Sequence, residues 1–365
     1  MDYFTIDSST FLRDGIIENF NSMIYVERFN AWGEFKLITP STPANRALLT
    51  PGKWIVRDGS YYPMRIETVD DKEDDADTAR LLTVTGRSME ALLDDRVAMP
   101  AFAGLATTPT WDLTDTPGNV IRAVFEGICV TGDLSVHDTI PFLHSGTILD
   151  PGNIPEPASS FAFSFNPDTV YNTIKKGVCD VFDMGFRLIR DGDTGNVYFE
   201  VYMGNDLTSD QTLLPAVIFS EDFANLYGVE WLKSIATEKT VAYVFSQNSY
   251  AVVLAPGASS SDEGFDKRVL LVDASDVTLT AGAPLTATLN NRGLQALAQN
   301  KAVYMFDGQI PQFASYTYGV DYNLGDVVEE RDSDGTATFV RVLEQIFVTN
   351  DQGDVNYPSF SITSI

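Results

Sequence analysis

The chain has 365 residues, of which 44% are hydrophobic, so it can bury a sizeable core and is long enough for about two to four domains. Its 24 basic and 51 acidic residues give a net charge of −27, which makes the chain a poor electrostatic partner for the phosphates of nucleic acid. The same charge also suits a protein that has only to stay soluble and avoid self-association.

Cysteine usage and hydropathy indicate the expected compartment. Cys129 and Cys179 are the only cysteines, which excludes a disulfide framework, and both lie in apolar helix-like patterns that predict buried thiols. The first residues lack the basic start and apolar run of a signal peptide, and no stretch approaches the length of a membrane span. We therefore expect the chain to fold in a reducing cytoplasm.

Strands dominate the N-terminal part of the chain. Residues 25–38 alternate, with Phe35 and Leu37 on one face and Glu34 and Lys36 on the other. This alternation is typical of a half-buried strand.

A strand, an Asp-Gly turn and a second strand follow, and the same succession recurs near the C-terminus. The two copies comprise residues 52–69 and 325–346. In each copy a glycine, Gly52 or Gly325, opens the first strand, and an arginine between apolar residues, Arg65 or Arg341, lies early in the second. Because Asp-Gly turns are common in unrelated β proteins, chance similarity is one explanation. The other is one β module used twice, with Gly52 equivalent to Gly325 and Arg65 to Arg341.

Two acidic segments only partly match calcium-binding loops. Residues 70–77 lack the glycine and the final glutamate of such a loop, and the segment that begins at Asp191 has Tyr202 at its twelfth position, where a bidentate acid is required. We therefore predict a solvated hairpin tip after a strand ending at Val69, a turn over residues 191–196, and no metal site.

Three helices are predicted between two β regions. Ser88 is the expected N-cap of a short helix over residues 89–96, and residues 120–130 form the second candidate. Asn166 is the expected cap of the third helix, with Pro167 at the first helical position, where proline is favoured.

The second half of the chain is again rich in predicted strands. A hairpin is expected over residues 186–201, and further strands over residues 241–253 and 269–273, joined by a flexible Gly- and Ser-rich loop. A helix is expected to begin after Asn291, followed by a strand over residues 302–305 and the second copy of the hairpin.

Catalytic chemistry has no recognisable signature. His137 and His144 are the only histidines, and no cysteine lies near them, so neither a zinc site nor a Ser-His-acid arrangement is indicated. A chain with 51 acidic residues contains many carboxylate pairs that could suit glycoside hydrolysis, so the presence of such pairs is little evidence for that activity. We predict that the protein is not an enzyme and has no catalytic residues, metal or cofactor.

The order of several short segments resembles a known protein family. The segments are ERFNAWGEFKL at 27–37, TGRS at 85–88, FSE at 219–221 with NL at 225–226, NRGLQAL at 291–297 and YNLGDVV at 322–328. In this order they resemble the tail-tip, or baseplate, hub proteins of long-tailed siphophages, the tail-associated Gp37-like minor tail protein family.

The resemblance implies a β-rich α+β fold with two related β-barrel-like hub domains and two smaller mixed α/β domains. The expected division has residues 1–100 as the first barrel-like domain and 101–205 as a mixed helix and hairpin domain. Residues 206–300 would be a second mixed region, and 301–365 would complete the second barrel-like domain, so that the domains interleave.

The resemblance also implies a structural role in the virion. Members of this kind form a homotrimeric ring at the tail tip, in which three chains with two modules each match the sixfold tail tube above. The implied partners are the distal tail protein, the tape measure protein and other tail-tip proteins. DNA would pass through an acidic channel during ejection, without sequence-specific binding. The protein would be made and assembled in the host bacterial cytoplasm.

Two alternatives remain open. One is a carbohydrate-binding or carbohydrate-cleaving tail component, because acids and 42 aromatic residues (Phe 23, Tyr 15, Trp 4) suit sugar rings. An exposed aromatic cluster beside a carboxylate pair would favour it. The other is a hub subunit of a cellular contractile injection device.

Overall fold

The computed structural model describes residues 1–73, 80–98, 111–132, 138–165, 167–247, 249–256, 258, 264–277, 283–309, 316–331, 335 and 337–362. Strands make up most of the regular structure in these residues, which confirms the β-rich class. None of the helices described is long and apolar enough to cross a membrane.

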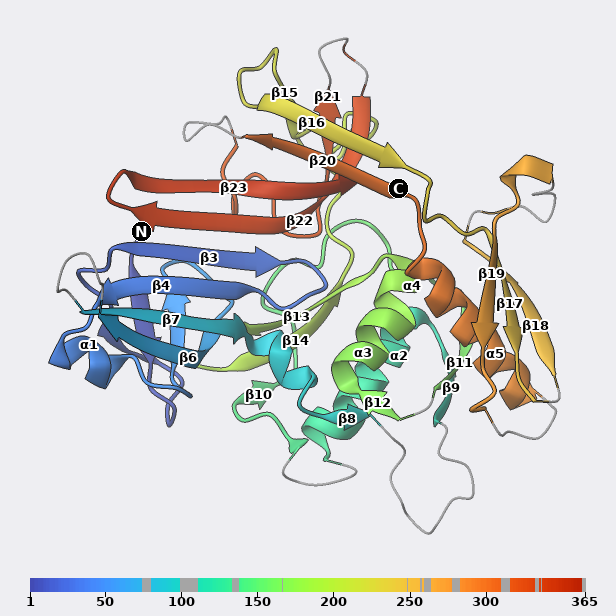
Figure 1. Cartoon of the computed structure of the whole chain (residues 1–365), viewed down its shortest axis with the longest axis horizontal. Coiled ribbons are helices and arrows are strands. Elements are labelled where there is room, and N and C mark those ends of the chain that lie inside the picture. Colours follow the sequence, from blue (N-terminus) through green and yellow to red (C-terminus); the bar gives the residue numbers. More distant parts are fainter. Residues whose placement is uncertain are drawn as a thin grey trace.

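A 13-stranded sheet is the largest element of the molecule (Figure 1). Its main path runs β16-β20-β23-β22-β3-β4-β7-β6-β5-β1-β2, and β21 and β15 branch from β22. Among the described strands no pairing closes a sheet into a barrel, so the barrel-like form of the two hub domains stays a prediction.

Five strands in the N-terminal part of this sheet form what we term the first module. They are β3 (Ser22–Arg28), β4 (Glu34–Pro40), β5 (Trp54–Arg57), β6 (Met64–Glu73) and β7 (Arg80–Ser88). In β4, Phe35 and Leu37 are buried while Glu34 and Lys36 are exposed, as the alternation predicts. The first module continues through β1 (Tyr3–Ile6), which is antiparallel to β5, into β2 (Arg13–Ile16). A short helix, α1 (Pro43–Leu48), precedes β5.

Five strands in the C-terminal part form the second module. They are β16 (Tyr227–Ser234), β20 (Val303–Gln309), β21 (Val327–Arg331), β22 (Ala337–Asn350) and β23 (Gly353–Ile362). Their order in the sheet, β16-β20-β23-β22-β21, repeats the order β3-β4-β7-β6-β5 of the first module, and their order along the chain also matches. The modules differ in the strand that lies next to the last one. Strand β21 pairs with a parallel strand, β15 (Ile218–Ser220), whereas β5 pairs with an antiparallel strand.

The two modules are joined by one strand pairing, which we call the seam. Residues 344–350 of β22 lie antiparallel to residues 28–22 of β3, so the second module and the first share one continuous sheet.

The segment between the modules in the sequence forms a helical and β layer against the sheet. Its strands are β8 (Val97–Ala98), β9 (Trp111–Asp115), β10 (Leu143–His144), β11 (Phe161–Phe165), β12 (Asp168–Thr169), β13 (Gly185–Arg190) and β14 (Val197–Tyr202). Its helices are η1 (Met89–Leu93), α2 (Pro117–Phe125), η2 (Glu126–Val130), α3 (Val170–Ile174), η4 (Lys175–Cys179) and α4 (Asp180–Phe182).

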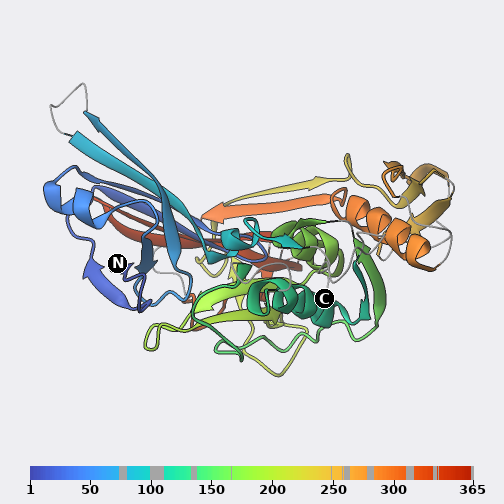
Figure 2. The ribbon, with the colours of Figure 1, turned by 90° about the horizontal axis from the view of Figure 1, so that it is seen from below.

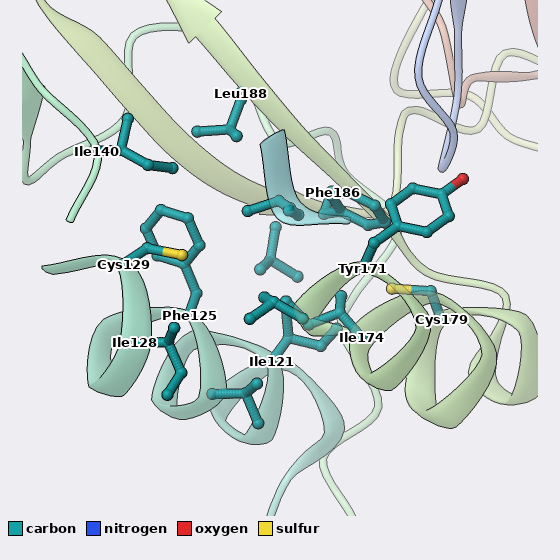
Figure 3. Packing of buried hydrophobic residues seen from close by; sticks show 14 of the residues in the cluster. Ile121, Phe125, Ile128, Cys129, Ile140, Tyr171, Ile174, Cys179, Phe186 and Leu188 are labelled. Atoms are coloured by element: carbon teal, nitrogen blue, oxygen red, sulfur yellow. The ribbon is translucent and has the colours of Figure 1, made fainter. Parts of the chain in front are cut away.

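The largest hydrophobic core lies in this layer. Figure 3 shows helical side chains such as Phe125 and Ile174 packed beneath Phe186 and Leu188 of β13. Cys129 and Cys179 are buried there as free thiols, as predicted, and burial raises the pKa of the Cys129 thiol to about 12. Burial raises the pKa of the Cys179 thiol as well, which favours the protonated form of both side chains at neutral pH.

A second small sheet is inserted between β16 and β20 in the sequence. It comprises β17 (Val241–Phe245), β18 (Tyr250–Leu254), β19 (Val269–Asp273), a short turn η5 (Gly264–Asp266) and helix α5 (Ala283–Ala298). The helix covers one face of this sheet, and the unit projects from one end of the molecule (Figures 1 and 2). The opposite face exposes apolar side chains, including Tyr250, Val252 and Leu271.

The helices begin at other residues than the sequence predicts. The third helix begins at Val170, capped by the Thr169 hydroxyl, which accepts from the Asn172 backbone N–H at 3.1 Å. Pro167 lies ahead of the helix because Asp168 and Thr169 first pair with β8, and Asn166 lies outside the described residues.

Three further boundaries differ from the predictions. Helix α5 begins at Ala283, well before Asn291, because its first turn accommodates a proline. The turn after Ser88 is a 3-10 helix that ends at Leu93, and Ser88 makes no side-chain capping bond there. Strand β6 runs on to Glu73 instead of ending at Val69, and the rest of the predicted acidic tip lies outside the described residues.

Candidate functional site

The two predicted hairpin copies have the same backbone hydrogen bonds. Gly52 N–H donates to the Ile66 carbonyl at 2.8 Å, and Gly325 N–H donates to the Val342 carbonyl at 2.9 Å. The return bonds also match, because Ile66 N–H donates to Lys53 at 2.7 Å and Val342 N–H donates to Asp326 at 2.9 Å.

The two predicted arginines occupy the same register position in these hairpins. Each arginine lies opposite the residue that comes two positions after the glycine of its hairpin. Arg65 lies opposite Trp54, and Arg341 lies opposite Val327. One residue after each arginine, the pairing with the next strand shifts: between Ile66 and Thr68 in β6, and between Val342 and Glu344 in β22. Equal register and an equal irregularity in both copies favour a duplicated module over chance similarity.

The surroundings of the two arginines differ. Arg341 is 3% exposed and donates to the carbonyls of Gly325 and Met203 at 2.5 and 2.6 Å. It also contacts the Asp183 carboxylate at 3.2 Å, and its guanidinium lies 5.3 Å from the ring centre of Phe29, which belongs to the first module. Arg65 is exposed.

The two glycines differ in the same way. Both have positive φ, +91° at Gly52 and +88° at Gly325, so each sits in a conformation that other residues resist. A Cβ on Gly325 would lie 2.7 Å from the Phe29 ring and 2.8 Å from the Tyr202 ring, whereas a Cβ on Gly52 would meet only an Arg65 nitrogen at 4.0 Å. The second hairpin is therefore covered by Phe29 and Tyr202, and the first is open.

The seam explains much of this covering. Phe29 follows β3 directly, and its N–H donates to the carbonyl of Leu343, the irregular position of β22, at 2.7 Å. Within the seam, Arg28 bonds the Glu344 carboxylate at 2.6 Å and Glu34 at 2.7 Å. The first module thus supplies the strand and the aromatic ring that cover this side of the second hairpin.

In the part of the chain that the structure describes, the large sheet has unpaired edges at its outer strands β2, β15 and β16 and along part of β6. In β6, residues 67–73 pair with β7 on one side only, and we call their other side the β6 edge. Strand β16 pairs only with β20, and its other side is the β16 edge. In Figure 2 the ribbon of β6 and β7 projects at one end of the molecule, and the ribbon of β16 and β20 runs from the middle towards the inserted unit at the other end. Exposed edges of this kind are templates for pairing with another chain.

A polar cavity of about 710 Å³ is lined by Glu27 of β3, Arg57 of β5 and the loops that contain residues 59–62 and 316–324. Its buried carboxylate, Glu27, accepts from the Ser60 hydroxyl at 2.7 Å, from the Tyr318 hydroxyl at 2.8 Å and from Arg57 at 3.2 Å. Through these three partners the Glu27 carboxylate holds together β5 and the loops that contain Ser60 and Tyr318.

The segments weighed as metal sites have other roles where the structure describes them. The Asp191 carboxylate accepts from the Asp193 N–H at 3.0 Å and the Thr194 hydroxyl at 2.6 Å, which is the geometry of a turn. Among the described residues, no group of three His, Cys, Asp or Glu side chains could hold a metal ion. His144 lies in β10, and His137 is outside the described residues.

Sequence reasoning missed two buried acids beside the modules. Burial raises the pKa of Glu90 to about 7, although its carboxylate accepts from the Leu188 N–H at 2.9 Å. Burial also raises the pKa of Asp326 to about 6, although its oxygens accept from the N–H groups of Asn205 and Asn323 at 2.7 and 2.8 Å. The Glu90 bond joins η1, which follows β7 of the first module, to β13 of the middle layer. The two Asp326 bonds join the start of β21 in the second module to the segment after β14 and to the loop before β21.

Comparison with known proteins gives a consistent result. A family described as Siphovirus ReqiPepy6 Gp37-like protein matches residues 4–356. No curated protein matches the chain. Solved structures with a similar fold include the 43 kDa tail protein of prophage MuSo2 from Shewanella oneidensis (TM-score 0.56, 13% identity, 100% of this chain and 98% of that one).

Two further tail proteins have a comparable fold. The tail protein from Neisseria meningitidis MC58 has a TM-score of 0.55 at 12% identity and covers 100% of this chain and 96% of that one. The prophage tail protein gp18 from Listeria monocytogenes EGD-e has a TM-score of 0.50 at 12% identity, covering 100% and 95%. The fold therefore extends along the whole chain of each relative.

Proposed function

Because the chain belongs to the Siphovirus ReqiPepy6 Gp37-like protein family, we propose that it is a structural tail protein that forms a trimeric hub ring at the tail tip of the virion. The family and the fold shared with three phage tail proteins support a tail component. The proposal goes further in assigning the hub position and the trimer.

The observation that carries the hub role is the repeated strand order joined by a single seam. Each chain holds two copies of one five-strand module, so three chains present six similar modules. Such a ring has threefold symmetry in its chains and near-sixfold symmetry in its modules. It can therefore contact a sixfold tube on one side and a threefold tip on the other. The distal tail protein and the tape measure protein are the expected neighbours.

The charge of the chain fits a channel for DNA. A wall that is net negative repels phosphates and forms few contacts that have to be broken as DNA moves. With −27 charges per chain, a ring carries a large excess of acids. Exchange of the acids that line the channel for lysine should slow genome ejection while particles still assemble. Unchanged ejection kinetics at low and high salt would leave solubility as the role of the charge.

An image reconstruction of the assembled tail tests the hub role directly. We expect three copies of the chain in one ring at the tip, with the modules of each chain alternating around the axis. Six chains in the ring, or a position along the tube or on the outside of the tail, would contradict the proposal.

A further inference from the structure

The β6 edge and the β16 edge belong to strands that correspond to the two strands of the seam. Strand β6 corresponds to β22 through Arg65 and Arg341, so the β6 edge, residues 67–73, corresponds to residues 343–349 of β22. Strand β16 corresponds to β3. Strand β16 pairs with β20 and β3 pairs with β4, and β20 and β4 occupy the same place in their modules.

The register of this second correspondence follows from the pairings across each module. Gly86 of the first module corresponds to Phe360 of the second, and their partners in the next strands are Phe35 and Phe306. Across the following pairing, Phe35 lies opposite Tyr25 and Phe306 lies opposite Trp231. Position 231 of β16 is therefore equivalent to position 25 of β3.

Equivalent apolar residues are buried in the seam and exposed at the β16 edge. Val26, in the strand paired with β22, is 6% exposed, whereas its equivalent, Leu232, is 52% exposed. Phe29 is 7% exposed, whereas its equivalent, Ile235, is 49% exposed. An exposed apolar strand edge of this kind needs a covering strand, and in the other module the covering strand is β22.

From these correspondences we infer that the β6 edge of one chain pairs antiparallel with the β16 edge of the next chain, in the register of the seam. The inference rests on the proposed ring and specifies its contact between chains. Asp70 then lies opposite Leu232 of the neighbouring copy, as Ile346 lies opposite Val26 in the seam, and Lys72 lies opposite Glu230.

The inferred contact also covers the open hairpin. In the seam Phe29 donates its N–H to Leu343 and packs over Gly325 and Arg341. In the equivalent contact, the Ile235 N–H of one copy donates to the Glu67 carbonyl of the next copy. The Ile235 side chain then packs over Gly52 and Arg65 of that next copy.

The pairing requires head-to-tail assembly. Within one chain, β22 of the second module already pairs with β3 of the first, which leaves one β6 edge and one β16 edge per chain. These two edges are different surfaces, so each chain binds one neighbour with each, and a rotation that closes produces a ring. The β6 edge is more polar than its equivalent in β22, where Ile346, Phe347 and Val348 replace Asp70, Asp71 and Lys72. This polarity keeps the edge soluble before assembly.

Cross-linking of the full-length chain tests the register. The double variant Asp70→Cys with Leu232→Cys places one thiol on each edge at directly opposed positions, where Cα atoms of paired strands are close enough for a disulfide. The native cysteines are buried and do not take part. Oxidation should join most chains covalently, with bands at two and three chain masses and none larger.

Two controls separate this pairing from other contacts. In Lys72→Cys with Leu232→Cys the thiols are displaced by two residues along the strand, so cross-linking should fall at least tenfold. Each single variant alone should not cross-link, because a head-to-tail contact never places a β6 edge against another β6 edge.

The outcomes distinguish the inference from the function on which it rests. A trimer that forms but does not cross-link through positions 70 and 232, or that cross-links equally in the displaced control, overturns the strand pairing and leaves the ring intact. A chain that stays monomeric at all concentrations overturns both the pairing and the ring.

Discussion

The two modules have the same strand order but are covered to different extents. In the second, Phe29 and Tyr202 crowd Gly325, and Arg341 is buried among main-chain carbonyls. In the first, Gly52 and Arg65 have the same backbone hydrogen bonds and stay open to solvent. The hairpin geometry therefore does not depend on the cover. The cover is an interface, internal in one copy and, in our account, supplied by a neighbouring chain in the other.

The largest expected difference between the modules concerns the arginines. Arg341→Met should lower the free energy of unfolding by about 3–5 kcal/mol, because two carbonyls lose their donor and Asp183 loses a charged partner. Arg65→Met should change it by less than about 0.5 kcal/mol, since exposed substitutions are usually small. Urea denaturation of both variants as monomers measures this. Equal losses would mean that Arg65 also has a structural role within the chain.

The buried acids should give opposite results when replaced by amides. The folded-state pKa of Glu90, about 7, lies above its ordinary value of 4.5, so the stability contributed by its protonated form is present below about pH 4.5 and is lost as the pH rises to about 7. One Glu90 oxygen accepts from the Leu188 N–H and the other from the Ser88 hydroxyl. Glu90→Gln removes this loss, because the amide is uncharged, its oxygen can accept from Leu188, and the Ser88 oxygen can turn to accept from its nitrogen. The variant should gain about 2–3 kcal/mol over the parent at pH 8 and nothing at pH 4.5.

Asp326→Asn should instead destabilise the second module at both pH values. Both Asp326 oxygens accept from main-chain N–H groups, and an amide nitrogen cannot accept the second of these bonds. We expect a loss of about 1–3 kcal/mol in urea titrations at pH 5 and pH 8. A gain at pH 8 would mean that the charge on Asp326, and not its hydrogen bonds, dominates.

The glycine pair gives a smaller contrast. Gly52→Ala and Gly325→Ala incur the same strain from a positive φ, about 1 kcal/mol, but only the second forces a methyl group against Phe29 and Tyr202. Gly325→Ala should therefore cost about 1–3 kcal/mol more than Gly52→Ala in thermal or urea unfolding. Equal costs would show that the Phe29 ring moves aside freely.

Leu232→Asp should affect assembly and leave the stability of the monomer almost unchanged. Leu232 is exposed in the monomer, so its unfolding free energy should change by less than about 0.5 kcal/mol, although its equivalent, Val26, is buried. Oligomers should nevertheless dissociate at concentrations at which the parent chain is assembled. Leu271→Asp, on the exposed face of the inserted sheet, is the matched control and should leave assembly unchanged.

Local features of the fold could be read from the sequence. The alternation around Phe35, the Asp58-Gly59 turn and the two glycine and arginine pairs are set by neighbouring residues, and the structure places them in strands or hairpins of the large sheet. Asp334 of the second Asp-Gly turn lies outside the described residues. The third helix shows where local reasoning failed. Asn166 and Pro167 are a valid start signal, but strand pairing of residues 168–169 with β8 delays the helix to Val170.

Long-range features could not be predicted in this way. An inserted sheet and α5 separate β16 from its partner β20 in the sequence, so the full length of the repeat was not visible. The burial of Arg341 depends on Phe29 and Met203, which are remote in sequence, and nothing near Arg341 distinguishes it from Arg65. The shared pattern of the two hairpins was therefore visible in the sequence, and their two different environments were not.

Native mass spectrometry of the purified full-length chain tests the central claim, that the open module is completed by another copy in a closed ring. The account predicts a complex of three chains of 40.1 kDa each, which persists in the Leu271→Asp control and dissociates in Leu232→Asp. A parent chain that is monomeric at every concentration, or that forms a stable dimer or a true hexamer, would contradict it.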